Sequence, residues 1–285
     1  MKPRFSKSLR NLNRVNSLTN RNQPNVHADV SSHSNEDVRL TQVVGRNAVA
    51  EALKSETNIS KIYVLYSAHG GSLNEIFTLA KIQGIPIARV DSKQFAELTK
   101  HLPREESAQG IVATISKIKF LPLRSLIEFS SKPSLLLVLD RIQDPQNFGA
   151  ILRSAVFFNV DGVVISKEQQ APINETVIKS SAGGAFHLRI ARETNLHQTI
   201  MALKEAGYWI ATSAAKAPVS ISEIDMNLPL AVVIGNEGSG VKRILREKSD
   251  MTFSIPQLGK IDSLNVSVAA GIIFYEIARQ RGELK

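Results

Sequence analysis

The chain has 285 residues, of which 43% are apolar and 21% charged, and this composition excludes a fibrous or wholly disordered protein. It contains no cysteine, which excludes disulfides, thiolate metal sites and a cysteine nucleophile and suits a reducing compartment such as the cytoplasm. The longest apolar run, residues 266–275, is shorter than the roughly 18 residues that cross a bilayer. No signal-peptide core follows the N-terminus, so we expect a soluble protein.

The net charge of +9 comes from 35 basic and 26 acidic residues and is concentrated near the N-terminus. Residues 1–40 carry seven Lys or Arg against three acids, none of them before Asp29, and show no apolar period. This pattern predicts a basic disordered tail that attracts RNA or DNA. A solubilising extension and an organellar transit peptide have similar compositions, so both alternatives stay open, as does an organellar matrix location.

Residues 41–117 alternate short helical and strand patterns and predict a small α/β domain. Helical spacing occurs at 45–54, 73–83 and 94–100, and strand patterns occur at 61–66, 86–90 and 110–116. Residues 118–133 include two prolines and a weak helical pattern, which predicts a linker.

Residues 134–285 repeat the alternation with longer apolar strands. Nearly continuous apolar runs occur at 135–139, 162–165, 209–212 and 230–234. Helical patterns occur at 148–158, 173–181, 196–206, 241–248 and 266–279. This alternation predicts an α/β domain with an open parallel sheet covered on both faces. Ligands of such sheets bind beyond the carboxyl ends of the strands, so the loops there are the candidate site.

The first candidate loop leads from the strand at 135–139 into a helix. Asp144 and Pro145 are typical of a helix start. Arg153 lies at the edge of the apolar stripe of this helix, one turn after Gly149. We expect the guanidinium to face an anionic partner, for which the glycine clears space. The alternative is an arginine in a surface ion pair.

The second candidate loop, GNEGSG at 235–240, follows the apolar strand at 230–234. Its glycines would let the backbone approach a ligand, and the next helix would offer free N–H groups. Glu237 would repel phosphate and suits a hydroxyl or an amine. The glycine order does not match a dinucleotide fingerprint, and no P-loop occurs in the chain.

The third candidate loop, IPQLGKIDSLN at 255–265, precedes a helix that is apolar nearly all round. Such a helix is expected to be buried in the domain or in a subunit interface. Ser263 and Asn265 are ordinary helix-capping residues at its start. The six histidines show no H-E-x-x-H spacing, and we expect no metal site.

Taken in order, N-x-G-A-I-x-R at 147–153, GNEGSG at 235–240 and IPQLGKIDSLNVSVA at 255–269 resemble the three motifs of the SpoU family of RNA ribose 2′-O-methyltransferases. The preceding domain, which begins VVGRNAVAEAL, resembles the ribosomal-protein-like RNA-binding domain of many members. Among members, the chain is most similar to bacterial 23S ribosomal RNA guanosine methyltransferases.

The resemblance implies a SPOUT-class α/β domain with a parallel sheet and a C-terminal trefoil knot, an exception to the rule that chains are unknotted. It implies an S-adenosylmethionine cofactor and a homodimer formed through the knot region. The cofactor-binding positions that it implies are Gly235, Ile255 and Leu264. The catalytic positions that it implies are Arg153, Asn147, Glu237, Ser263 and Asn265.

The predicted function is S-adenosylmethionine-dependent 2′-O-methylation of a ribose in structured RNA, with 23S-type ribosomal RNA favoured over transfer RNA. Arg153 would stabilise the attacking oxygen or a nearby phosphate, while Glu237 and Asn147 hold Arg153 and the ribose. The proton acceptor stays open, because arginine remains protonated. Two competing classes are a nicotinamide-dependent oxidoreductase and a non-catalytic RNA-binding protein. Arg189 stands where members often have proline, which bears on substrate fit.

Overall fold

The computed structural model describes residues 41–55, 57, 59–100, 108–115, 118–128, 133–260 and 263–284. The basic tail predicted at 1–40 lies outside these residues. None of the helices in the described ranges combines the length and the apolar character that a membrane span requires.

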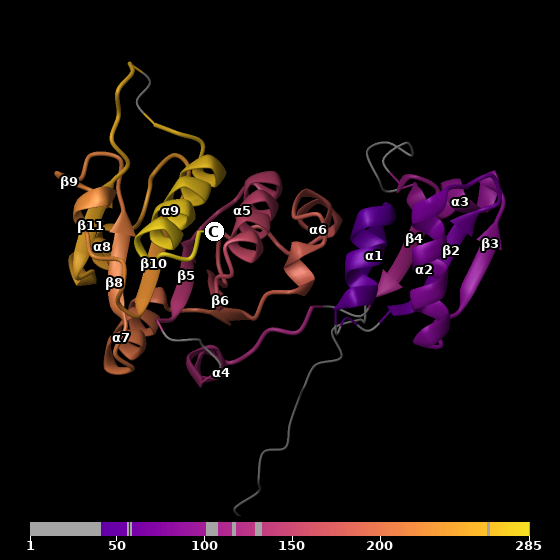
Figure 1. The fold of residues 1–285 in the computed structure, drawn as a ribbon, viewed down its shortest axis with the longest axis horizontal. Helices are drawn as coiled ribbons and strands as arrows, with labels where there is room; N and C mark the ends of the chain where they lie inside the picture. The colour runs from indigo at the N-terminus through magenta and orange to yellow at the C-terminus, as the bar shows by residue number, and fades with distance from the viewer. Residues whose placement is uncertain are drawn as a thin grey trace, which may run out of the picture. The chain divides into compact units, whose positions relative to one another are not determined.

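The N-terminal part of the described chain forms a four-stranded sheet in the order β1-β4-β2-β3 (Figure 1). Its strands are β1 (Thr41–Val44), β2 (Ile59–Leu65), β3 (Ile87–Val90) and β4 (Ile111–Ile115). Its helices are α1 (Arg46–Lys54), α2 (Gly71–Ile82) and α3 (Ser92–Thr99). Strand β4 is antiparallel to β1 and β2, whereas β2 and β3 are parallel. Helices α1 and α2 pack on one face of the sheet and α3 on the other.

Strand β1 is the one element of this sheet that the sequence patterns do not predict. Its four residues, TQVV, are too few to show a period, and a helix follows almost at once. Pairing with β4, which comes much later in the chain, makes these residues a strand.

The second sheet has seven strands in the order β7-β6-β5-β10-β8-β11-β9, and every pairing in it is parallel. Its strands are β5 (Leu135–Asp140), β6 (Gly162–Ser166), β7 (Ile190–Glu193), β8 (Trp209–Ser213), β9 (Val219–Ser220), β10 (Leu230–Gly235) and β11 (Met251–Ser254). The four long apolar runs form β5, β6, β8 and β10, as predicted. The other three strands are short and partly polar, so their sequences carry little strand signal.

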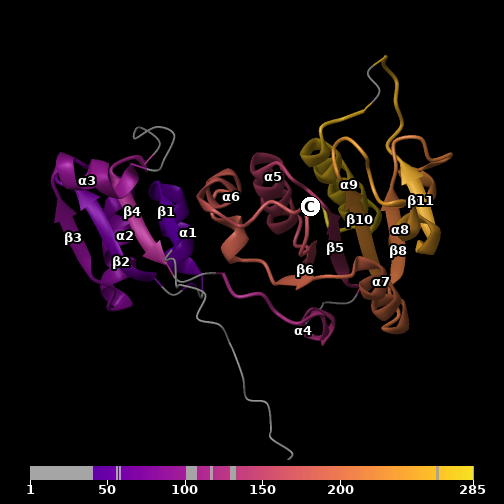
Figure 2. The same ribbon diagram turned by 180° about the vertical axis from the view of Figure 1, so that it is seen from behind.

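Helices cover both faces of this sheet (Figures 1 and 2). They are α4 (Leu123–Glu128), α5 (Pro145–Phe157), α6 (Glu175–Ser180), α7 (Leu196–Glu205), α8 (Arg243–Lys248) and α9 (Val266–Gln280), with short 3₁₀ turns η2 (Gly184–Phe186) and η3 (Ile221–Glu223). Alternate residues of β5 point to opposite faces. Leu137 packs with α5, α6 and α9, whereas Leu136 packs with α4, α7 and α8. The predicted linker therefore contains a helix, α4, that contributes Leu126 to the core.

Helix α9 is buried along one face only. Ile273, Phe274 and Ile277 of this face join the core beside α5, whereas Val268 and Tyr275 are each about half exposed, at 50% and 51%. The expectation of full burial for this helix is thus not met within one chain.

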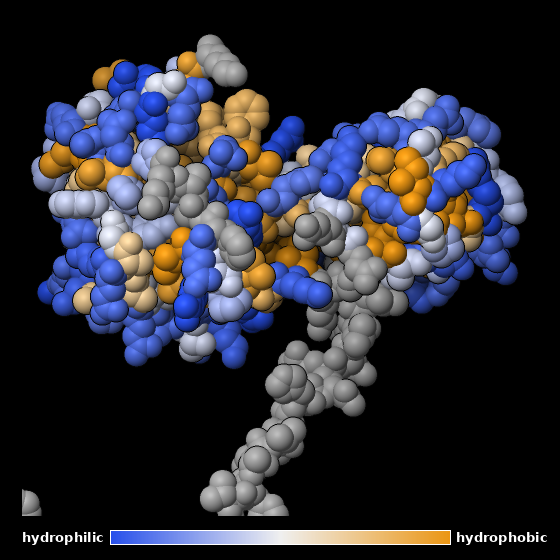
Figure 3. All heavy atoms as spheres, turned by 60° about the horizontal axis from the view of Figure 1, so that its bottom comes forward, coloured by the Kyte–Doolittle hydropathy of each residue, from blue (hydrophilic) through white to orange (hydrophobic). Residues whose placement is uncertain are grey.

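The visible surface in Figure 3 is mostly hydrophilic, with hydrophobic residues in separate patches.

Candidate active site

The three motif loops meet because β5 and β10 are neighbours in the sheet. Their last residues, Asp140 and Gly235, are paired in register, so the loops that follow them begin side by side. Helix α9 packs against α5 and brings the third loop to the same edge. Three segments far apart in sequence therefore share one site.

Asn147 joins all three loops through its side-chain amide. Its Nδ2 donates to Glu237 Oε1 at 3.1 Å, and its Oδ1 accepts from Asn265 Nδ2 at 2.9 Å. Asn265 also caps α9, because its Oδ1 accepts from the backbone N–H groups of Ser267 and Val268. Asn265 therefore caps α9 and also contacts Asn147 of the first loop.

Asn236 organises the second loop from within. Its Oδ1 accepts from the backbone N–H groups of Gly238 and Ser239 at 3.0 and 3.1 Å. Its Nδ2 donates to Glu237 Oε2 at 3.3 Å and to the Arg141 carbonyl oxygen at 3.1 Å. The backbone N–H groups of Gly238 and Ser239 are therefore occupied within the loop itself.

Position 235 requires glycine because the backbone at Gly240 and Val241 passes very close to it. A Cβ atom at this position would lie 2.2 Å from the backbone nitrogen of Val241 and 2.3 Å from the carbonyl carbon of Gly240. The loop folds back onto the end of β10 at this point, so no other residue fits without a shift of the backbone.

Asp140 and Arg141 belong to the site but were missed by sequence reasoning. The Asp140 carboxylate is buried and accepts from Arg141 Nε at 3.0 Å and from the backbone N–H of Lys242 at 2.8 Å. Arg141 Nη2 reaches the Gly240 carbonyl at 3.4 Å. This pair holds both ends of the second loop. An acid that closes an otherwise apolar strand, LLLVLD, was the available signal.

Arg153 is exposed on α5, and its side chain forms no hydrogen bond or ion pair with the other residues that the structure describes. The expected contacts to Asn147 and Glu237 are thus not formed in this state. Gly149 does not clear space for an anion. A Cβ there would lie 1.8 Å from Ser180 Oγ and 2.7 Å from the Val177 carbonyl oxygen, so this glycine permits close packing of α5 on α6.

The remaining predicted positions lie at the two ends of the third loop. Ile255 is half-buried directly after β11, and Leu264 is 52% exposed, two residues before the start of α9. Ser263 is exposed and forms no hydrogen bond within the described part of the chain. Helix α5 begins as predicted, because Asp144 Oδ1 accepts from the Gln146 N–H at 2.7 Å and Pro145 occupies the first turn.

The chain matches two family models over nearly all of its described length. Residues 134–275 match the SpoU rRNA Methylase family, and residues 42–121 match the domain described as RNA 2′-O ribose methyltransferase substrate binding. YacO of Bacillus subtilis, a protein assigned to the TrmH family of tRNA/rRNA methyltransferases, is 37% identical over 242 residues, covering 84% of this chain and 95% of YacO. A Staphylococcus saprophyticus protein of the same assignment is 36% identical, with the same coverage.

Solved structures show the same fold. The SpoU methyltransferase AviRb from Streptomyces viridochromogenes superposes with a TM-score of 0.72 at 22% identity and covers 86% of this chain and 90% of its own. An rRNA methyltransferase from Sinorhizobium meliloti, solved with AdoMet bound, has a TM-score of 0.72 at 24% identity and covers 86% and 89%. These likenesses confirm the predicted SPOUT-class α/β fold. The two family matches and the relatives show that the chain belongs to the SpoU/TrmH family of RNA 2′-O-ribose methyltransferases.

Proposed function

We propose that the chain transfers a methyl group from S-adenosylmethionine to a ribose 2′-hydroxyl in 23S-type ribosomal RNA. The observation that carries this proposal is the junction at Asn147, where polar side chains of all three motif loops meet. The family description and the Sinorhizobium meliloti structure both name rRNA, which supports a ribosomal substrate. Transfer RNA is the second candidate, because the curated relatives are named for both RNAs.

The proposed cofactor-binding positions are Gly235, Ile255 and Leu264, at the ends of β10, β11 and the third loop. Leu264 supports this assignment, because an apolar side chain that is 52% exposed can cover a purine ring. Gly235 and its neighbours present backbone rather than side chains at the site. S-adenosylmethionine, when bound, supplies an electrophilic methyl group that needs no metal ion for its transfer.

The protein's contribution is to position the hydroxyl and to stabilise charge. Arg153 has an exposed guanidinium without a carboxylate partner among the described residues, so it is available for the attacking oxygen or an adjacent phosphate. Glu237 uses two of its acceptor sites on Asn147 and Asn236, and its other lone pairs can accept from a ribose hydroxyl. Ser263 and Asn265 would contact the substrate from the opposite loop.

A second copy of the chain is the proposed occupant of the exposed apolar face of α5 and α9. Phe157 is 81% exposed, and both Phe157 and Tyr275 contact the ring of Phe158, with centroid distances of 5.0 and 6.5 Å. Val268 and Ile272 continue this patch along α9. Large side chains gathered on one exposed face are typical of a subunit interface. The patch ends near Leu264, so a homodimer would border the proposed cofactor site.

The remaining predictions concern domains and location. The two separate sheets, together with the matches over 42–121 and 134–275, support an RNA-binding domain at 41–117, a linker at 118–133 and a methyltransferase domain at 134–285. The tail at 1–40 is proposed to add RNA affinity through its basic residues. A cytoplasmic location is proposed because the relatives are bacterial proteins and the proposed substrate is RNA.

The test is methyl transfer from labelled S-adenosylmethionine to RNA from a strain that lacks the gene, followed by mapping of ribose methylation. We expect label on one 2′-oxygen of 23S ribosomal RNA. Label on transfer RNA alone would replace the proposed substrate. Cofactor and RNA binding without any transfer would instead identify a non-catalytic RNA-binding protein.

A further inference from the structure

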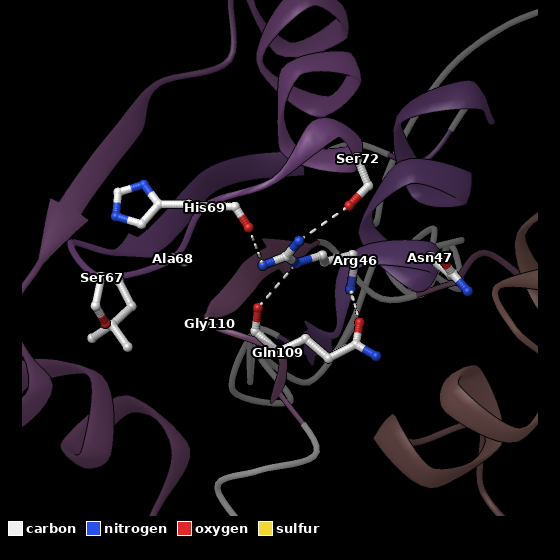
Figure 4. Close-up of a pocket in the computed structure, with 9 residues that line it drawn as sticks. Arg46, Asn47, Ser67, Ala68, His69, Ser72, Gln109 and Gly110 are labelled. Atoms are coloured by element: carbon white, nitrogen blue, oxygen red, sulfur yellow. Dashed lines mark hydrogen bonds between the residues drawn. The ribbon is translucent and has the colours of Figure 1, made fainter.

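The small sheet carries an open cavity of about 710 Å³ that is separate from the three motif loops. It is lined by the start of α1, the end of β2 with the turn after it, the start of α2 and the residues before β4. None of the lining residues that the structure describes is acidic. Figure 4 shows the guanidinium of Arg46 at its centre, between His69, Ser72 and Gln109.

Arg46 is fixed in this cavity by neutral partners. Its Nε donates to the Gln109 carbonyl at 3.3 Å, its Nη1 to Ser72 Oγ at 3.3 Å and its Nη2 to the His69 carbonyl at 2.9 Å. Its backbone N–H donates to Gln109 Oε1 at 2.9 Å. None of the ion pairs among the described residues includes Arg46, so its positive charge is not neutralised by a carboxylate.

A guanidinium has five N–H donors, and the three side-chain bonds of Arg46 leave two of them for a ligand. A phosphate group matches such a pair of donors. Because the side chain is already held by three bonds, binding would cost little further loss of rotamer freedom. The site is therefore organised before a ligand arrives.

Residues with positive φ angles are concentrated around this guanidinium. Gly45, Gly70, Gln109 and Gly110 all have positive φ angles, of 94°, 125°, 50° and 73°. Gln109 is the informative member, because a residue with a side chain pays a cost in this region. Such conformations cluster at functional sites, where the surrounding structure holds them.

The rim of the cavity carries polar side chains that have no hydrogen-bond partner in the described structure. The side chains of Asn47, Ser67 and His69 form no hydrogen bonds among the residues described. Leu65 and Ala68 add a small apolar surface. An amide, a hydroxyl and an imidazole beside a phosphate-binding guanidinium are the groups that contact base edges and stack on bases in RNA.

We propose that this cavity binds one unpaired RNA nucleotide, with its phosphate on Arg46 and its ribose and base against Asn47, Ser67 and His69. The inference rests on the proposed function, and it narrows the substrate to RNA that presents an unpaired residue to the small domain. A paired nucleotide fits poorly, because the base edges of an RNA helix are inaccessible in its deep, narrow groove. A protein ligand fits poorly too, because the described lining residues form an open cavity in which only Leu65 and Ala68 offer apolar side chains to an anchor residue.

The test uses the full chain and a fluorescent RNA hairpin with an unpaired loop, compared with a fully paired duplex of the same stem. Asn47→Asp adds a negative charge at the rim and removes no contact of the described structure. An acid in the first turn of α1 also favours the helix, so this variant should fold. The matched control is Gln94→Glu, which adds the same charge to the exposed first turn of α3, on the other face of the sheet.

We expect Asn47→Asp to raise the Kd for the hairpin about 10-fold, while Gln94→Glu changes it less than about twofold. Arg46→Gln should lower the slope of log Kd against log salt by about 0.7, the value for one lost contact to a single-stranded phosphate. Equal Kd values for Asn47→Asp and Gln94→Glu, or equal binding of hairpin and duplex, would overturn the proposal. Displacement of the hairpin by millimolar inorganic phosphate at constant ionic strength would also overturn it, because the cavity would then be a simple anion site.

Methyl transfer by the unmodified chain, measured on the same preparation, separates this inference from the proposed function. If the unmodified chain transfers methyl groups and Asn47→Asp binds the hairpin as tightly as the unmodified chain does, the proposed nucleotide site is rejected and the proposed enzyme activity is not. Absence of transfer from the unmodified chain rejects the proposed enzyme, whatever the cavity binds.

Discussion

The side-chain amide of Asn147 donates to the carboxylate of Glu237 across 3.1 Å, although the two residues are 90 positions apart in the chain. The same amide accepts from Asn265, so its orientation is set by two partners of opposite hydrogen-bonding character. An aspartate at position 147 would keep one bond and turn the other into a contact between two carboxylates.

We therefore expect Asn147→Asp to lower the free energy of unfolding by about 0.5–1.5 kcal/mol at neutral pH, the net contribution of a hydrogen bond, because Glu237 is exposed to solvent. The double variant Asn147→Asp/Glu237→Gln restores a donor facing an acceptor and should recover most of this loss. Urea denaturation of the two single variants and the double variant measures the coupling. Additive losses in the double variant would show that the two side chains do not interact in solution.

Arg153→Ala should lower single-turnover methyl transfer by roughly 10²-fold, the loss typical of removing a preorganised charge-stabilising group. The Kd for S-adenosylmethionine should be unchanged, because the proposed cofactor positions lie in the other two loops. Arg124→Ala is the control, since Arg124 is 87% exposed on α4, outside the motif loops. Transfer at the parental rate would make Arg153 an ordinary surface residue, whereas joint loss of binding and rate would give it a structural role.

Gly235→Ala should destabilise the methyltransferase domain by about 1–3 kcal/mol or more and abolish cofactor binding, because the new methyl group would overlap the backbone at Val241. Gly238→Ala is the matched control in the same loop. Its Cβ would have only one neighbour, Asn236 Oδ1 at 3.6 Å, an ordinary contact distance. Thermal unfolding and calorimetric titration of both variants measure these effects. Equal behaviour of the two variants would contradict the close approach at Gly235.

The homodimer is tested by charge at the exposed face of α5 and α9. Phe157→Glu and Tyr275→Glu should each convert a particle of about twice 31.3 kDa into a monomer, because a desolvated carboxylate opposes burial of the patch. Ile82→Glu replaces a residue of α2 that is 76% exposed and should leave the mass unchanged. Light scattering after gel filtration gives the masses. A monomeric mass for the unmodified protein would contradict the proposed homodimer.

Acid should weaken the C-terminal helix through Glu276. The hydrogen bonds from Arg279, together with one from Gln280, lower the pKa of Glu276 from 4.5 to about 2, against the opposing effect of desolvation. Because the folded-state pKa lies below the unfolded value, the stabilisation is present above about pH 4.5 and is lost as the pH falls toward 2.

Glu276→Gln should therefore cost up to about 1 kcal/mol at pH 7, the usual contribution of a surface ion pair, and almost nothing near pH 2. Urea denaturation of both proteins across this pH range gives the difference. A difference that does not change with pH would mean that the ionised carboxylate does not carry the stabilisation.

The sequence by itself determined the elements with strong local signals. The apolar runs that form β5, β6, β8 and β10 and the helices between them are encoded within each segment, by periodicity and by caps such as Asp144. The ordered triple of motifs also indicated the family before any contact was known. The motif positions could be identified from the sequence because each motif is a short contiguous segment.

The tertiary structure decided which residues from distant parts of the chain contact one another. Gly149 packs on α6, Asp140 closes the second loop through Lys242, and Arg281 donates to four carbonyl groups, those of Pro133, Ser134, Met226 and Leu228. Each of these contacts joins positions remote in the chain, and no local period encodes them. The short strands β1, β7, β9 and β11 form for the same reason, since their hydrogen bonds come from neighbours that only the folded sheet supplies.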